Sequence, residues 1–133
     1  MVINLKDDPS FHTTDSEHIE EVLNEMKLTG KLKGVLFANR NGDIIAENII
    51  NNFDGNIFAA MCASILESAE DLRKNLSSKK LKKIIAELEN GQTILIIECN
   101  NNTFLSFILD KESKIDPILN KIEEYCMKML KTY

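Results

Sequence analysis

The side chains that could do acid–base or nucleophilic chemistry are few in this chain. It has two histidines, His12 and His18, and three widely spaced cysteines, Cys62, Cys99 and Cys126. A histidine that binds a metal or acts as a base needs a second ligand or a nucleophile nearby, and neither spacing nor context supplies one. Each cysteine is set among apolar residues, where a thiol stays protonated and unreactive. We therefore expect no catalytic residue, no metal site and no cofactor, and we interpret the cysteines as reduced, buried thiols.

Residues that could act on a nucleotide are also scarce. No glycine-rich loop of the Walker or dinucleotide-binding type occurs in the sequence. Arg40 and Arg73 could reach a nucleotide's phosphates in trans, as arginine fingers do, but an arginine in a turn is far more often a surface residue. An enzyme that pairs Cys62 with His18 is a further interpretation, which the apolar setting of the thiol disfavours. These patterns favour a protein that is not an enzyme.

Composition narrows the class of protein further. The chain's 133 residues, of which 44% are hydrophobic and 28% charged, fit one domain with its own core. A net charge of -5 argues against nucleic-acid binding and against adhesion to anionic membranes, because both need concentrated basic charge. No apolar run approaches the roughly 18 residues that span a bilayer, and no secretory signal is visible. We expect a flexible arm over residues 1–14, a folded domain over residues 15–133 and a cytoplasmic location.

Hydrophobic periodicity and turn signals predict the order helix, two strands, helix, three strands, helix. The first helix should start near Thr14, whose spacing to Glu17 suits a capping box, or at a neighbouring cap. Asn41-Gly42 is the strongest hairpin signal, because both residues tolerate a positive φ. The predicted elements cover residues 14–30, 34–39, 43–49, 55–76, 81–88, 92–99, 103–109 and 116–130.

The segment before the second hairpin is ambiguous. Leu81, Ile84, Ile85 and Leu88 have helical spacing. A strand over residues 81–88 would instead pair through the following turn, with lysines protecting an exposed edge. We favour the strand, and the predicted fold class is α+β: a five-stranded antiparallel sheet with helices on both faces, because the last strands are apolar on both alternations.

The long helix over residues 55–76 holds more apolar surface than one core needs. Its core face is predicted to comprise Ile57, Phe58, Met61, Cys62, Ile65, Ala69, Leu72 and Leu76. Ala59, Ala63 and Leu66 widen the small and apolar zone beyond that face. The alternatives are a deeply packed helix in a monomer, or alanines present for helix propensity alone. We favour a partner helix, because small residues let two helices approach closely.

At this point the sequence resembles the roadblock/dynein light-chain family, small regulators and scaffolds of Ras-like GTPases. Residues 34–46, GVLFANRNGDIIA, are similar to the family's strand–turn–strand. Further likeness lies in the small-residue helix FAAMCAS at residues 58–64 and in the strands over residues 91–98 and 104–109. The resemblance runs from about Ser16 to Leu130.

The resemblance implies a profilin-like architecture and a homodimer, or a heterodimer with a paralogue. In such dimers the long helices pair and the third strands join, which supports the strand over residues 81–88. It implies an interface and a GTPase-docking surface on the paired helices. The interface would contain Ala59, Ala63, Leu66, Lys82 and Ile84, and the partner-binding surface Ala60, Glu67, Glu70 and Asp71.

The function we expect is therefore a homodimeric regulator or scaffold that binds a small Ras-like GTPase without a catalytic residue of its own. The main alternative is a small-molecule sensor of the GAF or PAS type, which can share this order of elements. A sensor would need a cavity with convergent polar groups between sheet and helix. The densely apolar strands speak against one.

Overall fold

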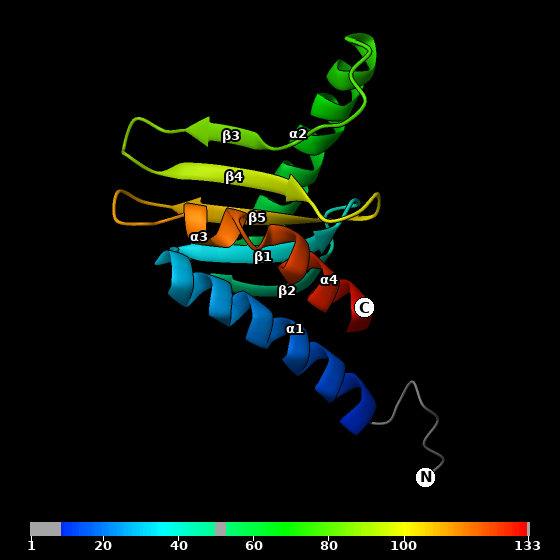
Figure 1. The fold of residues 1–133 in the computed structure, drawn as a ribbon, viewed down its shortest axis with the longest axis vertical. Coiled ribbons are helices and arrows are strands. Elements are labelled where there is room, and N and C mark those ends of the chain that lie inside the picture. Colours follow the sequence, from blue (N-terminus) through cyan, green and yellow to red (C-terminus); the bar gives the residue numbers. More distant parts are fainter. Residues whose placement is uncertain (1–8, 50–52, 133) are drawn as a thin grey trace.

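A computed structural model describes residues 9–49 and 53–132, and in it the expected five-stranded antiparallel sheet carries helices on both faces (Figure 1). The strands lie in the order β2-β1-β5-β4-β3. No helix within the described ranges is long and apolar enough to cross a membrane. The elements are α1 (Pro9–Gly30), β1 (Gly34–Asn39), β2 (Ile44–Ile49), α2 (Gly55–Asn75), β3 (Ile84–Glu87), β4 (Thr93–Glu98), β5 (Thr103–Leu109), α3 (Asp116–Leu119) and α4 (Ile122–Thr132).

Strands β1 and β5 lie side by side within the sheet and contribute side chains to separate apolar clusters on its two faces. Val35 and Phe37 point into the cluster under α1, α3 and α4, whereas Leu36 and Ala38 point into the cluster under α2. This alternation follows from the two-residue period of a strand. The expectation that both faces are covered is confirmed.

Three element boundaries differ from the sequence prediction. Helix α1 begins at Pro9 and not near Thr14, because proline suits a first helical turn and no breaker follows before Gly30. Residues 9–14, which were predicted to belong to the flexible arm, are therefore part of the helix. Residues 1–8 lie outside the described ranges. Strand β3 covers only Ile84–Glu87, and the closing helix is interrupted between Leu119 and Ile122.

The orientation of α2 about its axis also differs from the prediction. Its buried residues are Ala59, Cys62, Ala63 and Leu66, packed on Leu36, Ala38, Ile96 and Phe104 of the sheet. The larger residues predicted for the core, Ile57, Met61, Ile65, Leu72 and Leu76, are 44–72% exposed. Both sets have helical spacing, so periodicity alone could not separate them. The small residues face the sheet because large sheet side chains such as Phe104 already fill the space there.

The first hairpin turn is pressed against α2 and requires a glycine. Asn39 Oδ1 accepts hydrogen bonds from the backbone N–H groups of Asn41 (3.0 Å) and Asp43 (3.1 Å), which closes the turn. Gly42 has a φ of 90°, and a Cβ there would lie 2.9 Å from Ala60 Cα. The hairpin therefore meets the helix backbone at this point.

Replacement of Gly42 by alanine should destabilise the fold by about 2–4 kcal/mol, the sum of left-handed backbone strain and a clash with an immovable backbone. Gly91→Ala is the matched control, since Gly91 has a φ of 89° but a Cβ there meets only the flexible Lys111 side chain. The control should lose only about 1–2 kcal/mol. Urea unfolding of both variants measures the difference, and equal losses would contradict the close contact of the turn with α2.

Candidate functional site

Helix α2 presents two exposed sides besides the one that packs on the sheet. Asp54 caps the helix, its side chain accepting hydrogen bonds from Asn56 N (3.1 Å) and Ile57 N (3.2 Å). The first exposed side is the apolar stripe, which we define as Ile57, Met61, Ile65, Leu72 and Leu76. From Ile57 to Leu72 the stripe is about 23 Å long at the helical rise of 1.5 Å per residue. A stripe of this kind is typical of a surface that another protein covers.

The second exposed side of α2 is polar and contains three of the four residues predicted to bind a partner. Ala60, Glu67 and Asp71 are exposed there. Glu70 is turned toward the sheet and forms an ion pair with Arg73. The structure thus brings Ala60, Glu67 and Asp71 together on one side and separates Glu70 from them.

The residues predicted for the dimer interface also fall into two sets, one buried and one accessible. Ala59, Ala63 and Leu66 are buried against the chain's own sheet, with 0%, 7% and 1% exposure, so a partner subunit cannot contact them. That part of the prediction is wrong, because the helix uses its small residues for intramolecular packing. On the edge-strand side, Lys82 is exposed and Ile84 is half-buried.

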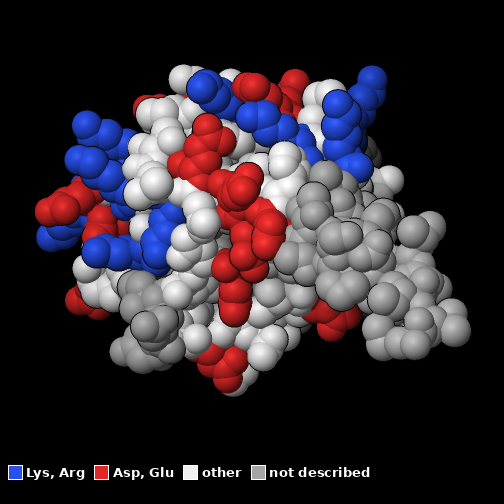
Figure 2. Space-filling view, turned by 90° about the horizontal axis from the view of Figure 1, so that it is seen from below, with Lys and Arg blue, Asp and Glu red and all other residues white. Residues whose placement is uncertain are grey.

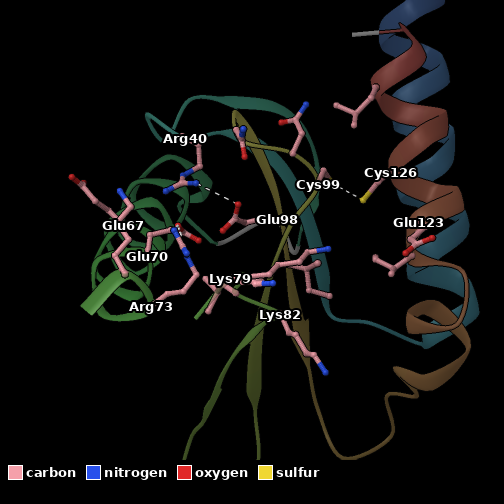
Figure 3. A pocket seen from close by; sticks show the side chains of 18 of the residues that line it. Arg40, Glu67, Glu70, Arg73, Lys79, Lys82, Glu98, Cys99, Glu123 and Cys126 are labelled. Atoms are coloured by element: carbon pink, nitrogen blue, oxygen red, sulfur yellow. Dashed lines mark hydrogen bonds and ion pairs between the residues drawn. The ribbon is translucent and has the colours of Figure 1, made fainter. Parts of the chain in front are cut away.

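A groove of about 1250 Å³ opens beside α2 (Figure 3). It exists because β3 begins at Ile84, which pairs with Ile96, so that the following residues of β4 extend beyond their neighbour. Its walls come from the second half of α2, residues 79–82, the end of β4 with the turn after it, and α4. Charged side chains of both signs line it, together with apolar residues of β4 and α4.

Four charged residues form a network at the α2 side of this groove. Arg73 donates to Glu70 Oε2 from Nε at 3.0 Å, and Arg40 Nη1 lies 3.6 Å from Glu98 Oε2. Arg73 Nη1 also donates to the Ser78 carbonyl at 2.7 Å. Neither guanidinium therefore projects freely as an arginine finger would.

The carboxyl groups of Glu70 and Glu98 share a hydrogen bond across the network. Burial, and then the adjacent Glu70 carboxylate, raise the pKa of Glu98 above its ordinary value. The hydrogen bond from Glu98, together with Arg73, lowers the pKa of Glu70. Glu98 is thus the member of the pair that holds a proton more readily, and Glu70 is the one that stays charged.

The cysteines and His18 lie at two separate places in the fold. Burial raises the pKa of the Cys62 thiol, which lies on the sheet-facing side of α2. His18 belongs to α1, which covers the other face of the sheet. The interpretation that pairs these two residues is therefore wrong. Cys99 and Cys126 come together, with their Sγ atoms 2.7 Å apart, and this pair was missed by sequence reasoning because the residues are separated by 27 positions.

Residues that could hold a metal are not gathered anywhere in residues 9–49 and 53–132, where no group of three or more histidine, cysteine or acidic side chains converges. The glutamates of α1, Glu17, Glu20 and Glu21, are exposed, as expected for a solvated face. Seen from below Figure 1, acidic side chains form a band with lysines and arginines at its margins (Figure 2).

Comparisons with known proteins agree with the fold. Residues 18–108 match the family model described as the Roadblock/LC7 domain. An uncharacterised protein of Methanocaldococcus jannaschii, MJ0714, is 27% identical over 78 residues, which are 59% of this chain and 66% of that protein. The chain thus spans just under two thirds of that relative's length.

Solved structures share this fold, among them two MglB proteins. The gliding protein MglB of Thermus thermophilus superposes with a TM-score of 0.78 at 15% identity, covering 89% of this chain and 90% of that one. Myxococcus xanthus MglB gives 0.78 at 16% identity, covering 87% of each chain. At these identities the likeness shows a shared fold.

Because the pKa of Glu98 is raised, we expect this residue to make the free energy of unfolding depend on pH. Because the folded state raises the pKa of Glu98 above 4.5, its contribution to folding is fully present below that pH and is lost as the pH rises through the raised value. Glu98→Gln mimics the protonated acid and keeps a hydrogen-bond donor for Glu70. The variant should be more stable than the native protein at pH 7, and the two should converge near pH 4.

Urea midpoints measured between pH 4 and 7.5 test this expectation. Glu123→Gln, an exposed carboxylate on the opposite wall of the groove, controls for the loss of one negative charge. A difference that is independent of pH, or one shared by the control, would contradict the assignment.

Proposed function

The chain belongs to the Roadblock/LC7 domain family, and on this basis we propose that it is a homodimeric regulatory or scaffold protein that binds a small Ras-like GTPase. The observation that carries the proposal is the apolar stripe of α2. Five large side chains stand exposed on α2 and its C-cap, although the small residues of the helix already pack against the chain's own sheet. Their burial by a partner is worth about 25 cal/mol for each Å² removed from water.

The partner for the stripe is a second copy of the chain in this proposal. Two α2 helices would pair through the stripe, and the free edges of two β3 strands would meet alongside. Ile85, which is 53% exposed on β3, supports this arrangement, since an edge strand with exposed apolar residues is prone to pair with another strand. Lys82 and Ile84 would then lie at or beside the interface.

The GTPase would dock on the polar side of α2. Ala60, Glu67 and Asp71 lie next to the stripe, so that in a pair of helices they would border the shared surface. The carboxylates of Glu67 and Asp71 suit a partner with a basic docking surface. A protein of this kind acts by holding the switch loops of the GTPase in one arrangement, which requires no catalytic residue of its own.

The small-molecule sensor remains the second candidate, and the site gives it less support. The space between each face of the sheet and its helices is filled by the two apolar clusters. The groove beside α2 is open to solvent and lined mostly by charged side chains. A ligand pocket is usually enclosed and mainly apolar.

Replacement of Ile65 by glutamate tests the dimer. A charge buried in the helix pair should weaken self-association by about 100-fold or more without disturbing the fold, because Ile65 is exposed in the single chain. Light scattering should show a dimer for the native protein and a monomer for Ile65→Glu. Leu28→Glu, at an 81% exposed position on α1, is the matched control and should remain dimeric. A dimer that survives Ile65→Glu would remove the helix-pair argument.

Reversal of charge on the polar side tests the partner surface. Glu67→Lys combined with Asp71→Lys should weaken binding of the cognate Ras-like GTPase about tenfold, and the loss should shrink at high salt. Binding is measured by biolayer interferometry against purified Ras-like GTPases loaded with GDP or a non-hydrolysable GTP analogue. Glu20→Lys with Glu21→Lys, on the opposite face of the sheet, is the control. Equal losses in both double variants would contradict a specific surface on α2.

A further inference from the structure

Two thiols meet at one end of the groove, away from the surfaces proposed for the dimer and the GTPase. Cys99 follows the last residue of β4, and Cys126 lies on α4. Their sulfur atoms are 2.7 Å apart and face one another across the junction of sheet and helix (Figure 3). The third cysteine, Cys62, belongs to α2, is buried against the other face of the sheet and does not line the groove.

The backbone on both sides holds the two sulfurs in this arrangement. Cys126 belongs to the apolar cluster on the α1/α4 face, and Cys99 packs against the same cluster. The Cys99 N–H donates to the Thr103 carbonyl at 3.0 Å, which fixes the turn after β4. A disulfide has a sulfur–sulfur length of about 2.05 Å, so the sulfurs need to approach by only about 0.7 Å.

Both cysteines border the groove. Cys99 is half-buried and Cys126 is 8% exposed, and both belong to the groove's lining. The volume of about 1250 Å³ is large enough for a small organic disulfide. The hydrogen bond with Cys99 lowers the pKa of Cys126, while the same bond raises the pKa of Cys99. Cys126 is therefore the thiol that attacks first, since the thiolate is the nucleophile.

We propose that Cys99 and Cys126 form an oxidisable dithiol, which a low-molecular-weight disulfide such as oxidised glutathione converts into an intramolecular disulfide. The Cys126 thiolate attacks one glutathione sulfur, forms a mixed disulfide and releases the other glutathione as a thiolate. Cys99, after losing its proton, attacks Cys126 Sγ and releases the second glutathione. Two protein thiols are oxidised and one glutathione disulfide is reduced, and the two protons end on the two glutathione sulfurs.

The new bond would fasten α4 covalently to the end of β4. It closes a loop between positions 27 residues apart and includes the interruption between α3 and α4. Such a crosslink reduces the freedom of the unfolded chain, so the oxidised protein should have a higher Tm by roughly 5–10 °C. Oxidation of the two thiols would therefore make the α4 wall of the groove more rigid.

The test is incubation of the full, folded chain with oxidised glutathione, followed by intact-mass spectrometry and peptide mapping. We expect the loss of two hydrogen atoms, one remaining free thiol assigned to Cys62, and a linked peptide pair that contains Cys99 and Cys126. The Tm of the oxidised protein should rise, and a reductant should reverse the change. A synthetic peptide dithiol in the same tube verifies that the oxidant is active.

Single-cysteine variants separate the proposed pair from general thiol reactivity. Cys62→Ala should form the same disulfide with the same Tm shift, whereas Cys99→Ser should stop at a mixed disulfide on Cys126 and gain no stability. Three unreacted thiols in the native chain, a disulfide that involves Cys62, or a bond between two chains would each overturn the proposal. A failure of this test leaves the dimer and GTPase proposals untouched, because neither depends on the groove's thiols.

Discussion

The packing of α2 against the sheet determines where every other interaction surface lies. The helix approaches the sheet through Ala59, Ala63 and Leu66, because Phe104 and Leu36 rise from the strands to fill the space beneath it. The first hairpin turn closes on the same helix, with no room for a side chain at Gly42. Two contacts thus fix the rotation of α2 about its axis. Once that rotation is fixed, the stripe that begins at Ile57 must face solvent, and the side that carries Glu67 must stand beside it. Because α2 uses its small residues to pack against the sheet, its large apolar residues are left exposed on the surface.

The same region shows how a short strand produces a groove. Strand β3 starts only at Ile84, so within the described residues the end of β4 has no hydrogen-bonded strand on that side. Charged groups fill the opening: Glu70 and Glu98 share a hydrogen bond, and an arginine neutralises each of them. A half-buried pair of carboxyl groups survives there because one member keeps its proton more readily. The network connects α2, the first hairpin and β4, and it engages both arginines in ion pairs along the groove wall.

These surfaces fit a protein that works by contact. Family membership, the apolar stripe and the polar side beside it support a dimer that presents a composite surface to a GTPase. The thiol pair at the far end of the groove adds a chemical feature that the contact function does not use. It lies on the face covered by α1 and α4, whereas the proposed docking surfaces lie on α2.

The order of elements, the antiparallel hairpins and the family were predictable from the sequence, since they depend on local signals. Asn41-Gly42 specifies a turn by its own backbone preferences, and the apolar runs of β1 and β5 require cover on both faces. Which side of α2 faces the sheet was not predictable, because two stripes with the same helical period compete and only the shapes of residues such as Phe104 decide between them. Cys99 and Cys126 illustrate the same limit. Nothing in a spacing of 27 residues indicates a contact, and only the docking of α4 beside the end of β4 brings the two sulfurs together.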